Sequence, residues 1–311
     1  MAHGDHEGWK RGRKSVSRFL DLARQAEFLR RRHPGDRREI LPASQGGLRP
    51  FRVLTVASNK GGVGKTTLAT NLAVYLRALR EDLPILVLNL DDQTVVDAMF
   101  AMSDECAGGN LVAAMREGTF AGALRLGQYG VHYVPSSPDV SDLKRTADAP
   151  LRLENVLERT GWRGLVIVDT KSDLEILTQS AIAASDLVLI PVPDWPALRE
   201  ARKVFELLEN WHWPRDRARI VLSMVDRHIK YAEGETRDVL ALLLQEIRRL
   251  DYPLLGTFLS RSPKVAALQT NPDGRSVSIL HGAPRSLVHR QMRYLAEDVL
   301  KILEQIPVRG A

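Results

Sequence analysis

The sequence predicts an α/β fold, a mostly parallel twisted sheet with helices on both faces. From Phe51 onward, short apolar runs alternate with longer helical stretches, which is the pattern of strands joined by crossover helices. The runs are continuously apolar, as expected for strands that are buried on both sides. A chain of 311 residues can enclose a substantial core. We expect a basic N-terminal helical extension over residues 1–50 and one α/β domain over residues 51–311.

The elements of this domain can be placed in chain order. Strands are predicted at residues 53–57, 84–90, 131–134, 164–169, 186–192, 218–224 and 254–258. Helices are predicted at residues 65–80, 109–117, 151–160, 173–184, 196–211, 234–249 and 284–305. Ligands of such sheets bind at the carboxyl ends of the strands. The motifs described below all follow strands, so they should meet at one edge of the sheet.

Composition excludes several classes of protein. Cys106 is the only cysteine, which leaves no disulfide framework and no cysteine set for a zinc or iron–sulfur site. No apolar run approaches the ~18 residues of a membrane span, and the charged N-terminus lacks the apolar core of a signal peptide. These features predict a cytoplasmic protein.

The positive charge of the chain is concentrated at its N-terminus. Residues 1–50 carry twelve Lys and Arg against six acids, and this excess equals the net charge of +6 of the whole chain. Residues 15–32 have the periodicity of a short amphipathic helix, followed by Pro34-Gly35 and a polar linker. A basic arm of this kind indicates an acidic partner such as DNA or lipid, or only a solubilising segment.

One glycine-rich segment carries the strongest chemical signal. Residues 60–67 read KGGVGKTT, between a predicted strand and a predicted helix. Glycines allow a tight turn whose N–H groups point at phosphate oxygens, a lysine supplies positive charge to the β- and γ-phosphates, and the next hydroxyl can ligate Mg²⁺. Asn59 stands where the ordinary motif has its first glycine, and Lys60 adds a second lysine ahead of Gly61.

This variant resembles the deviant Walker A motif of the ParA/MinD family of ATPases, with the ParA branch most similar. Further segments resemble the family in the same order: ILVLNLDDQ (85–93), LVIVDT (165–170), SDLVLIPV (185–192), IVLSMVD (220–226) and FLSRSPKVAALQTNPDGRSV (258–277). The resemblance spans about Phe51 to the C-terminus. It implies a P-loop nucleotide-binding fold, ATP and Mg²⁺ as cofactors, and slow ATP hydrolysis.

The resemblance also assigns roles to single residues. It makes Lys60, Lys65 and Asp91 the catalytic set, with Lys60 reaching the partner's phosphates across a dimer interface and Asp91 orienting the attacking water. Thr66, Asp91 and Asp169 would serve magnesium, and a carboxylate buried at a strand end favours such a role. The phosphate contacts would come from Lys60, Gly61, Gly62, Val63, Gly64, Lys65, Thr66 and Thr67. The candidates for adenine contacts are Asp226, Ser262 and Pro263.

Three positions depart from the family pattern. Asn89 replaces the first Asp of the family's DxDPQ motif and Asp92 replaces its Pro, while Lys171-Ser172 replace the Pro-Pro that usually follows the Walker B strand. Asn89 removes a negative charge beside the magnesium position, and Lys171 adds a positive one. We expect these changes to affect turnover and switching more than nucleotide binding.

The resemblance implies a positioning protein. It would form a homodimer with ATP, bind DNA without sequence preference, associate with the nucleoid, and be reset by a ParB-like or other activating partner. Basic residues that could contact DNA in the C-terminal half are Arg261, Lys264, Arg275, Arg285, Arg290 and Arg293. The alternatives are a MinD-like switch that uses the N-terminal helix on a membrane and a small-molecule ligase with the same fold. The short tail after Pro307 lacks a basic-apolar anchor, which argues against the membrane.

Overall fold

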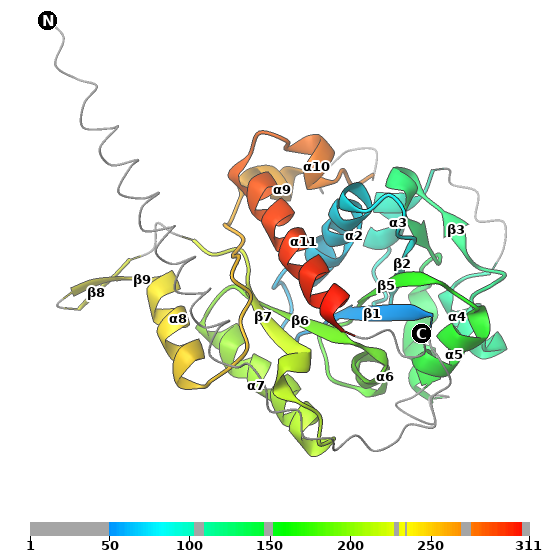
Figure 1. Cartoon of the computed structure of the whole chain (residues 1–311), viewed down its shortest axis with the longest axis horizontal. Helices are drawn as coiled ribbons and strands as arrows, with labels where there is room; N and C mark the ends of the chain where they lie inside the picture. Colours follow the sequence, from blue (N-terminus) through cyan, green and yellow to red (C-terminus); the bar gives the residue numbers. More distant parts are fainter. Residues whose placement is uncertain are drawn as a thin grey trace, which may run out of the picture.

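A seven-stranded sheet forms the centre of the protein (Figure 1). The computed structural model describes residues 50–102, 109–145, 152–226, 230–233, 235–268 and 275–306. The sheet order is β3-β4-β2-β5-β1-β6-β7, and only the β3–β4 pair is antiparallel. The strands are β1 (Phe51–Val56), β2 (Ile85–Asn89), β3 (Arg125–Leu126), β4 (His132–Tyr133), β5 (Gly164–Asp169), β6 (Leu187–Val192) and β7 (Ala218–Leu222). The predicted fold class is confirmed.

Helices bury both faces of the sheet because successive side chains of the central strands point to opposite sides. In β1, Leu54 packs in one core with α2 (Lys65–Leu79), α3 (Val95–Phe100), α10 (Ile279–Gly282) and α11 (Leu287–Gln305). Val53 packs in a second core with α4 (Leu111–Glu117), α5 (Arg152–Thr160) and α6 (Ile176–Ala184). A third core joins β6 and β7 to α7 (Trp195–Asn210) and α8 (Val239–Arg249). The result is a three-layer arrangement (Figure 1).

Several local expectations differ from the structure. Residues 254–258 do not form a strand: they run beside β7 and make only isolated bridges, at Leu254 and, just beyond, at Ser260. Main-chain hydrogen bonds hold both ends of this stretch but do not continue through its middle. The helix expected from residue 234 begins at Val239, because β8 (Lys230–Glu233) and β9 (Glu235–Asp238) pair as a hairpin.

The shortest elements were not predicted. They are β3, α3, α9 (Pro263–Ala267), α10 and the 3₁₀ segments η1 (Gln128–Gly130), η2 (Pro138–Arg145) and η3 (Arg215–Arg217). One or two turns are too short to show a period in sequence. The predicted N-terminal helix lies outside the described residues. Among the helices that the structure describes, none is long and apolar enough to cross a membrane.

Three neighbouring strands end at the same level of the sheet. Val56 of β1 and Asn89 of β2 are both in register with Asp169 of β5, which lies between them. The glycine-rich loop leaves β1, the post-β2 loop (residues 90–94) leaves β2, and the post-β5 loop (residues 170–175) leaves β5. Parallel pairing therefore gathers the three predicted chemical segments at one edge.

Candidate functional site

The glycine-rich loop turns sharply from β1 into α2. Gly62 and Gly64 have φ values of 71° and 86°, in the left-handed region that favours glycine. Side chains outside the loop hold its backbone: the Ser223 hydroxyl donates to the Val63 carbonyl at 3.2 Å. The first turn of α2 follows directly, so its unpaired N–H groups and the positive end of the helix dipole lie at the loop. This is the geometry of an anion-binding helix start.

Lys65 places its ammonium group beside the post-β5 loop. Its side chain is buried, and Nζ donates to the Ser172 hydroxyl at 2.6 Å and to the Lys60 carbonyl at 3.4 Å. Burial lowers the pKa of Lys65, while the charges of Asp169, Asp91 and Asp173 oppose that change. Lys65 and the two predicted carboxylates are therefore within electrostatic reach of one another, as the sequence predicted.

Asp169 is fully buried at the end of β5. Among the described residues, neither of its carboxylate oxygens accepts a hydrogen bond of regular geometry. Burial raises the pKa of Asp169 to about 7, and the nearby Thr66 hydroxyl and Lys65 charge oppose the rise. A buried carboxylate without a full set of donors is costly unless a cation joins it. Asp169 and the Thr66 hydroxyl therefore fit the protein side of a magnesium site.

This donor set is small, as is usual for magnesium that is bound with a nucleotide. In the described part of the chain, no cluster of three or more His, Cys, Asp or Glu side chains forms a metal cage. Mg²⁺ commonly uses one or two carboxylates and takes its other ligands from water and phosphate oxygens. The arrangement at Asp169 and Thr66 is compatible with that pattern.

Asp91 lies in the post-β2 loop, which a side chain of β2 organises. The Asn89 carbonyl oxygen Oδ1 accepts from the Asp91 backbone N–H at 3.0 Å. Burial raises the pKa of the Asp91 carboxyl, and the neighbouring Asp92 adds to the rise. The buried Asn89 thus orients the residue that the sequence assigned to the attacking water.

Lys60 has a partner that the sequence did not reveal. Its Nζ donates to both carboxylate oxygens of Asp194, at 2.8 and 2.7 Å. Asp194 also caps α7 by accepting from the Ala197 backbone N–H at 2.8 Å. The sequence Asp194-Trp195-Pro196 is a helix-start signature that would have identified the cap. The motif indicated only a role at the partner's phosphates, and the structure adds this ion pair within the chain.

The predicted adenine contacts lie on neighbouring segments. Val225 and Ser260 form a parallel bridge, which brings Asp226 close to the turn that leads into α9. Pro263 is exposed at the first turn of α9, and Asp226 is half-buried. The two segments converge as expected, and their role in base recognition remains a prediction.

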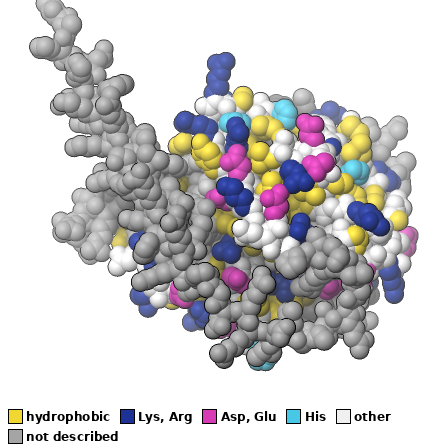
Figure 2. All heavy atoms as spheres, in the orientation of Figure 1, with side chains coloured by type: hydrophobic (Ala, Val, Ile, Leu, Met, Phe, Trp, Pro, Cys, Tyr) yellow, Lys and Arg dark blue, Asp and Glu magenta, His cyan; other side chains and the backbone are white. Residues whose placement is uncertain are grey.

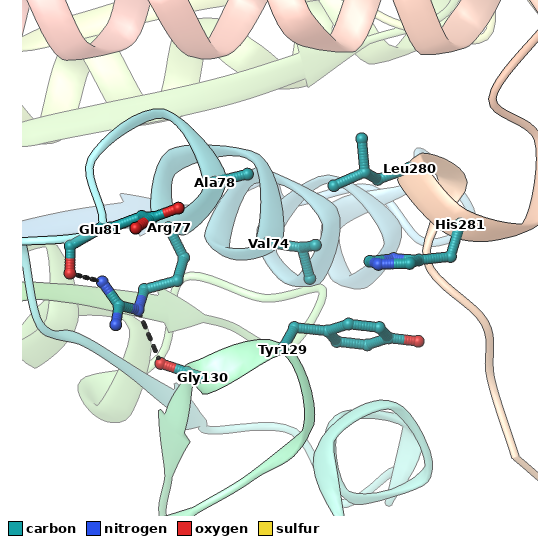
Figure 3. A pocket seen from close by; sticks show the side chains of 8 residues that line it. All are labelled: Val74, Arg77, Ala78, Glu81, Tyr129, Gly130, Leu280 and His281. Carbon is teal, nitrogen blue, oxygen red and sulfur yellow. Dashed lines mark hydrogen bonds between the residues drawn. The ribbon is translucent and has the colours of Figure 1, made fainter.

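A separate hollow lies at the far end of α2 (Figure 3). Its cavity volume is about 300 Å³, and its lining includes Arg77, Tyr129 and His281. Tyr129 stacks on His281 with ring centroids 4.6 Å apart, and Arg77 donates to the Gly130 carbonyl at 3.0 Å. Residues 74–81 belong to the C-terminal part of α2 and its following turn, whereas the glycine-rich loop precedes the helix. The hollow is therefore not part of the phosphate site.

Comparisons with known proteins agree with this geometry. A family model described as an AAA domain matches residues 51–202. The chain is 29% identical to the chromosome partitioning protein ParA of Caulobacter vibrioides (strain NA1000 / CB15N) over 216 residues, which is 62% of this chain and 76% of that protein. It is 24% identical to the septum site-determining protein MinD of Bacillus subtilis over 271 residues, 81% of this chain and 92% of that one.

A solved structure shows how widely the fold is used. Cobyrinic acid a,c-diamide synthase from Mycobacterium smegmatis, with bound ADP and magnesium, superposes with a TM-score of 0.64 at 18% identity, covering 84% of this chain and 98% of that one. At this identity the likeness concerns the fold alone.

The fold and the phosphate loop define a P-loop ATPase. Together with the relatives, they support assignment of the chain to the ParA/MinD family, to whose members it is similar.

Proposed function

We propose that this protein is a ParA-like positioning ATPase that cycles between nucleotide states on DNA. It would bind Mg-ATP, form a homodimer, bind DNA without sequence preference, and be reset when a partner protein stimulates hydrolysis. The observation that carries the proposal is the convergence of Lys65, Asp91 and Asp169 at the level ends of β1, β2 and β5.

Each residue has a role that follows from its position. The loop backbone and Lys65 bind the phosphates, and the Thr67 hydroxyl reaches the α-phosphate. Thr66 and Asp169 would hold magnesium, whose charge would neutralise that of the phosphates. Asp91, on the neighbouring strand end, accepts a hydrogen bond from the attacking water and directs it in line.

Lys60 supports the dimer proposal. The pair with Asp194 is partly exposed, with 29% of the lysine side chain and 44% of the aspartate side chain accessible. Ion pairs of such exposure contribute little free energy. Lys60 can therefore leave Asp194 and bind a phosphate of the other subunit at little energetic cost. Asp194 would keep its capping bond to α7 when Lys60 leaves. The ion pair therefore keeps the Lys60 side chain near the loop but is weak enough to be exchanged.

The proposed DNA binding rests on the distribution of charge over the chain and not on one site. The six basic candidates of the C-terminal half are all exposed. On the face in Figure 2, however, the described Lys and Arg side chains are interspersed with Asp and Glu side chains, and Arg293 pairs with Glu297 at 3.0 Å. The excess charge of residues 1–50 makes that arm the stronger contributor to phosphate contacts. We propose it as the main DNA-binding element, outside the domain of residues 51–311.

Two other functions use the same fold. The similarity to MinD supports a membrane-associated switch, with the N-terminal segment as the anchor. The diamide synthase shows that a synthase also uses this fold, and fold alone does not select among these activities. Sequence relatives in partitioning and the second lysine of the loop favour the positioning ATPase.

The first test is ATP turnover with the loop lysine removed. Lys65→Ala should lose nucleotide binding or hydrolysis, whereas Asp91→Ala should bind ATP and fail to turn it over. Phosphate release and binding of a fluorescent ATP analogue, both with Mg²⁺, measure the two steps. Unchanged turnover in Lys65→Ala would refute the assignment of the site.

A further inference from the structure

Two of the positions that depart from the family pattern, Asp92 and Lys171, contact each other. Lys171 in the post-β5 loop forms an ion pair with Asp92 in the post-β2 loop, with Nζ and Oδ2 2.7 Å apart. About a third of each side chain is accessible, 34% for the lysine and 35% for the aspartate. The hydrogen bond from Lys171 holds the pKa of Asp92 at about 2, well below its usual range. Two prolines at these positions could form no such pair.

Asn89, at the end of β2, holds the same post-β2 loop through hydrogen bonds. Its amide nitrogen donates to the Gln93 carbonyl at 2.5 Å and to the Ser136 hydroxyl at 3.0 Å, while its oxygen accepts from the Asp91 N–H. A carboxylate could accept the last bond but has no N–H group to donate to a carbonyl. The amide therefore closes the post-β2 loop in a way that the family's aspartate cannot.

Ser172 links the second loop to the phosphate loop. Its hydroxyl accepts from Lys65 Nζ at 2.6 Å, and its Oγ would lie 3.7 Å from a Cβ placed on Gly61. Lys171 and Ser172 thus connect one short loop to both neighbours, to the post-β2 loop through Asp92 and to the phosphate loop through Lys65. The two residues follow Asp169 and Thr170 in the chain, so the connection starts from the strand end that carries the buried carboxylate.

We propose that Lys171 is a positioning residue of the ATPase: its ion pair with Asp92 fixes the post-β2 loop so that the adjacent Asp91 faces the phosphate loop. This inference rests on the proposed function and specifies how this chain performs it. Lys171 acts on the loop through its ion pair with Asp92, and its charge also acts on the Asp91 carboxylate, where it opposes the rise in pKa. Nucleotide affinity depends on the glycine loop and Lys65, so loss of the pair affects turnover rather than binding.

The test compares steady-state ATP turnover by the full chain in excess Mg²⁺. Lys171→Met should lower kcat by about fivefold, the most that a partly exposed pair is expected to contribute. The KM for ATP should stay within about twofold of wild type, since the groups that bind the ground state are untouched. Lys171→Arg should retain most of the wild-type rate.

Reversing the charges of the ion pair distinguishes a positioning role of Lys171 from a general disruption of the structure. Lys171→Asp and Asp92→Lys should each lower kcat, and the double variant should recover most of the loss, because the pair is restored in the opposite orientation. Arg202→Met is the matched control: Arg202 pairs with Glu206 on α7 at 3.1 Å, away from the site, and its removal should leave kcat unchanged. Thermal unfolding of every variant checks that the domain is intact.

The outcomes discriminate the two proposals. A wild-type protein without ATP turnover refutes the proposed function and this inference with it. A wild-type protein that turns over ATP, with kcat unchanged in Lys171→Met, refutes the inference alone. A fall in kcat that neither Lys171→Arg nor the reversed pair recovers, or that is matched by weaker ATP binding, also refutes it.

Discussion

Asp169→Asn should make the protein more stable at neutral pH while removing its activity. The wild-type carboxyl is fully buried, and burial raises its pKa from 3.8 to about 7. Between these two values the folded protein holds a proton that the unfolded chain has released. Stability must therefore fall as pH rises through this range, and level off above pH 7. Asparagine has the same shape and does not ionise.

The magnitude follows from the pKa shift. Each unit of difference between the folded and unfolded pKa corresponds to about 1.4 kcal/mol. From about pH 4.5 to about pH 8, the wild-type protein should lose about 3 kcal/mol of unfolding free energy relative to Asp169→Asn. An unpaired amide and an unpaired protonated carboxyl are both polar, so their burial penalties nearly cancel at the acidic end.

Urea unfolding at a series of pH values, with EDTA present, measures this difference directly. Asp139→Asn controls for the loss of one carboxylate, because Asp139 is exposed. Parallel curves for wild type and Asp169→Asn across the whole range would refute the reasoning, since they would show that Asp169 ionises in the folded protein at its ordinary pKa. Mg-ATP should reverse the order of stability, because it binds wild type better.

Two further predictions concern assembly and DNA. Asp91→Ala with ATP should sediment as a dimer, and adding Lys60→Ala should return it to a monomer, because the second lysine would no longer reach the partner's phosphates; a monomer throughout would contradict the family mechanism. Deleting residues 1–50 should leave ATP turnover intact but weaken binding to random duplex and flatten its salt dependence, as measured by fluorescence anisotropy at several salt concentrations. Equal affinity of the truncated and full-length proteins would assign the arm to a docking or membrane role instead.

The sheet was predictable because its signal is repeated and long. Runs such as the one over residues 165–168 are continuously apolar, and a glycine loop fixes the start of α2. The segment after residue 253 was misread because its apolar run packs against the sheet edge without continuous pairing. An apolar pattern indicates that a segment is buried, and it does not distinguish a strand from a buried segment at the edge of the sheet.

The sequence indicated the single residues of the candidate site, but not the ion pairs that join residues far apart in the chain. The motif alone indicated Lys65, and a strand-end carboxylate indicated Asp169. The pairs Lys60–Asp194 and Lys171–Asp92 join residues 134 and 79 positions apart, so no local pattern could show them. The sequence revealed the departures at Asn89, Asp92 and Lys171 as separate exceptions, and only the folded chain shows their contacts.

The level ends of β1, β2 and β5 restrict where this chain can change in length. A residue inserted within any of these strands would advance its end by about 3.3 Å and turn the following side chain to the opposite face. Asp169 would then leave the edge that holds the phosphate loop, even if the sheet still formed. The turn before β2, with its exposed Arg80–Asp82 pair, lies at the other edge and carries no such requirement. Insertions and deletions should therefore be tolerated there and excluded from the three central strands.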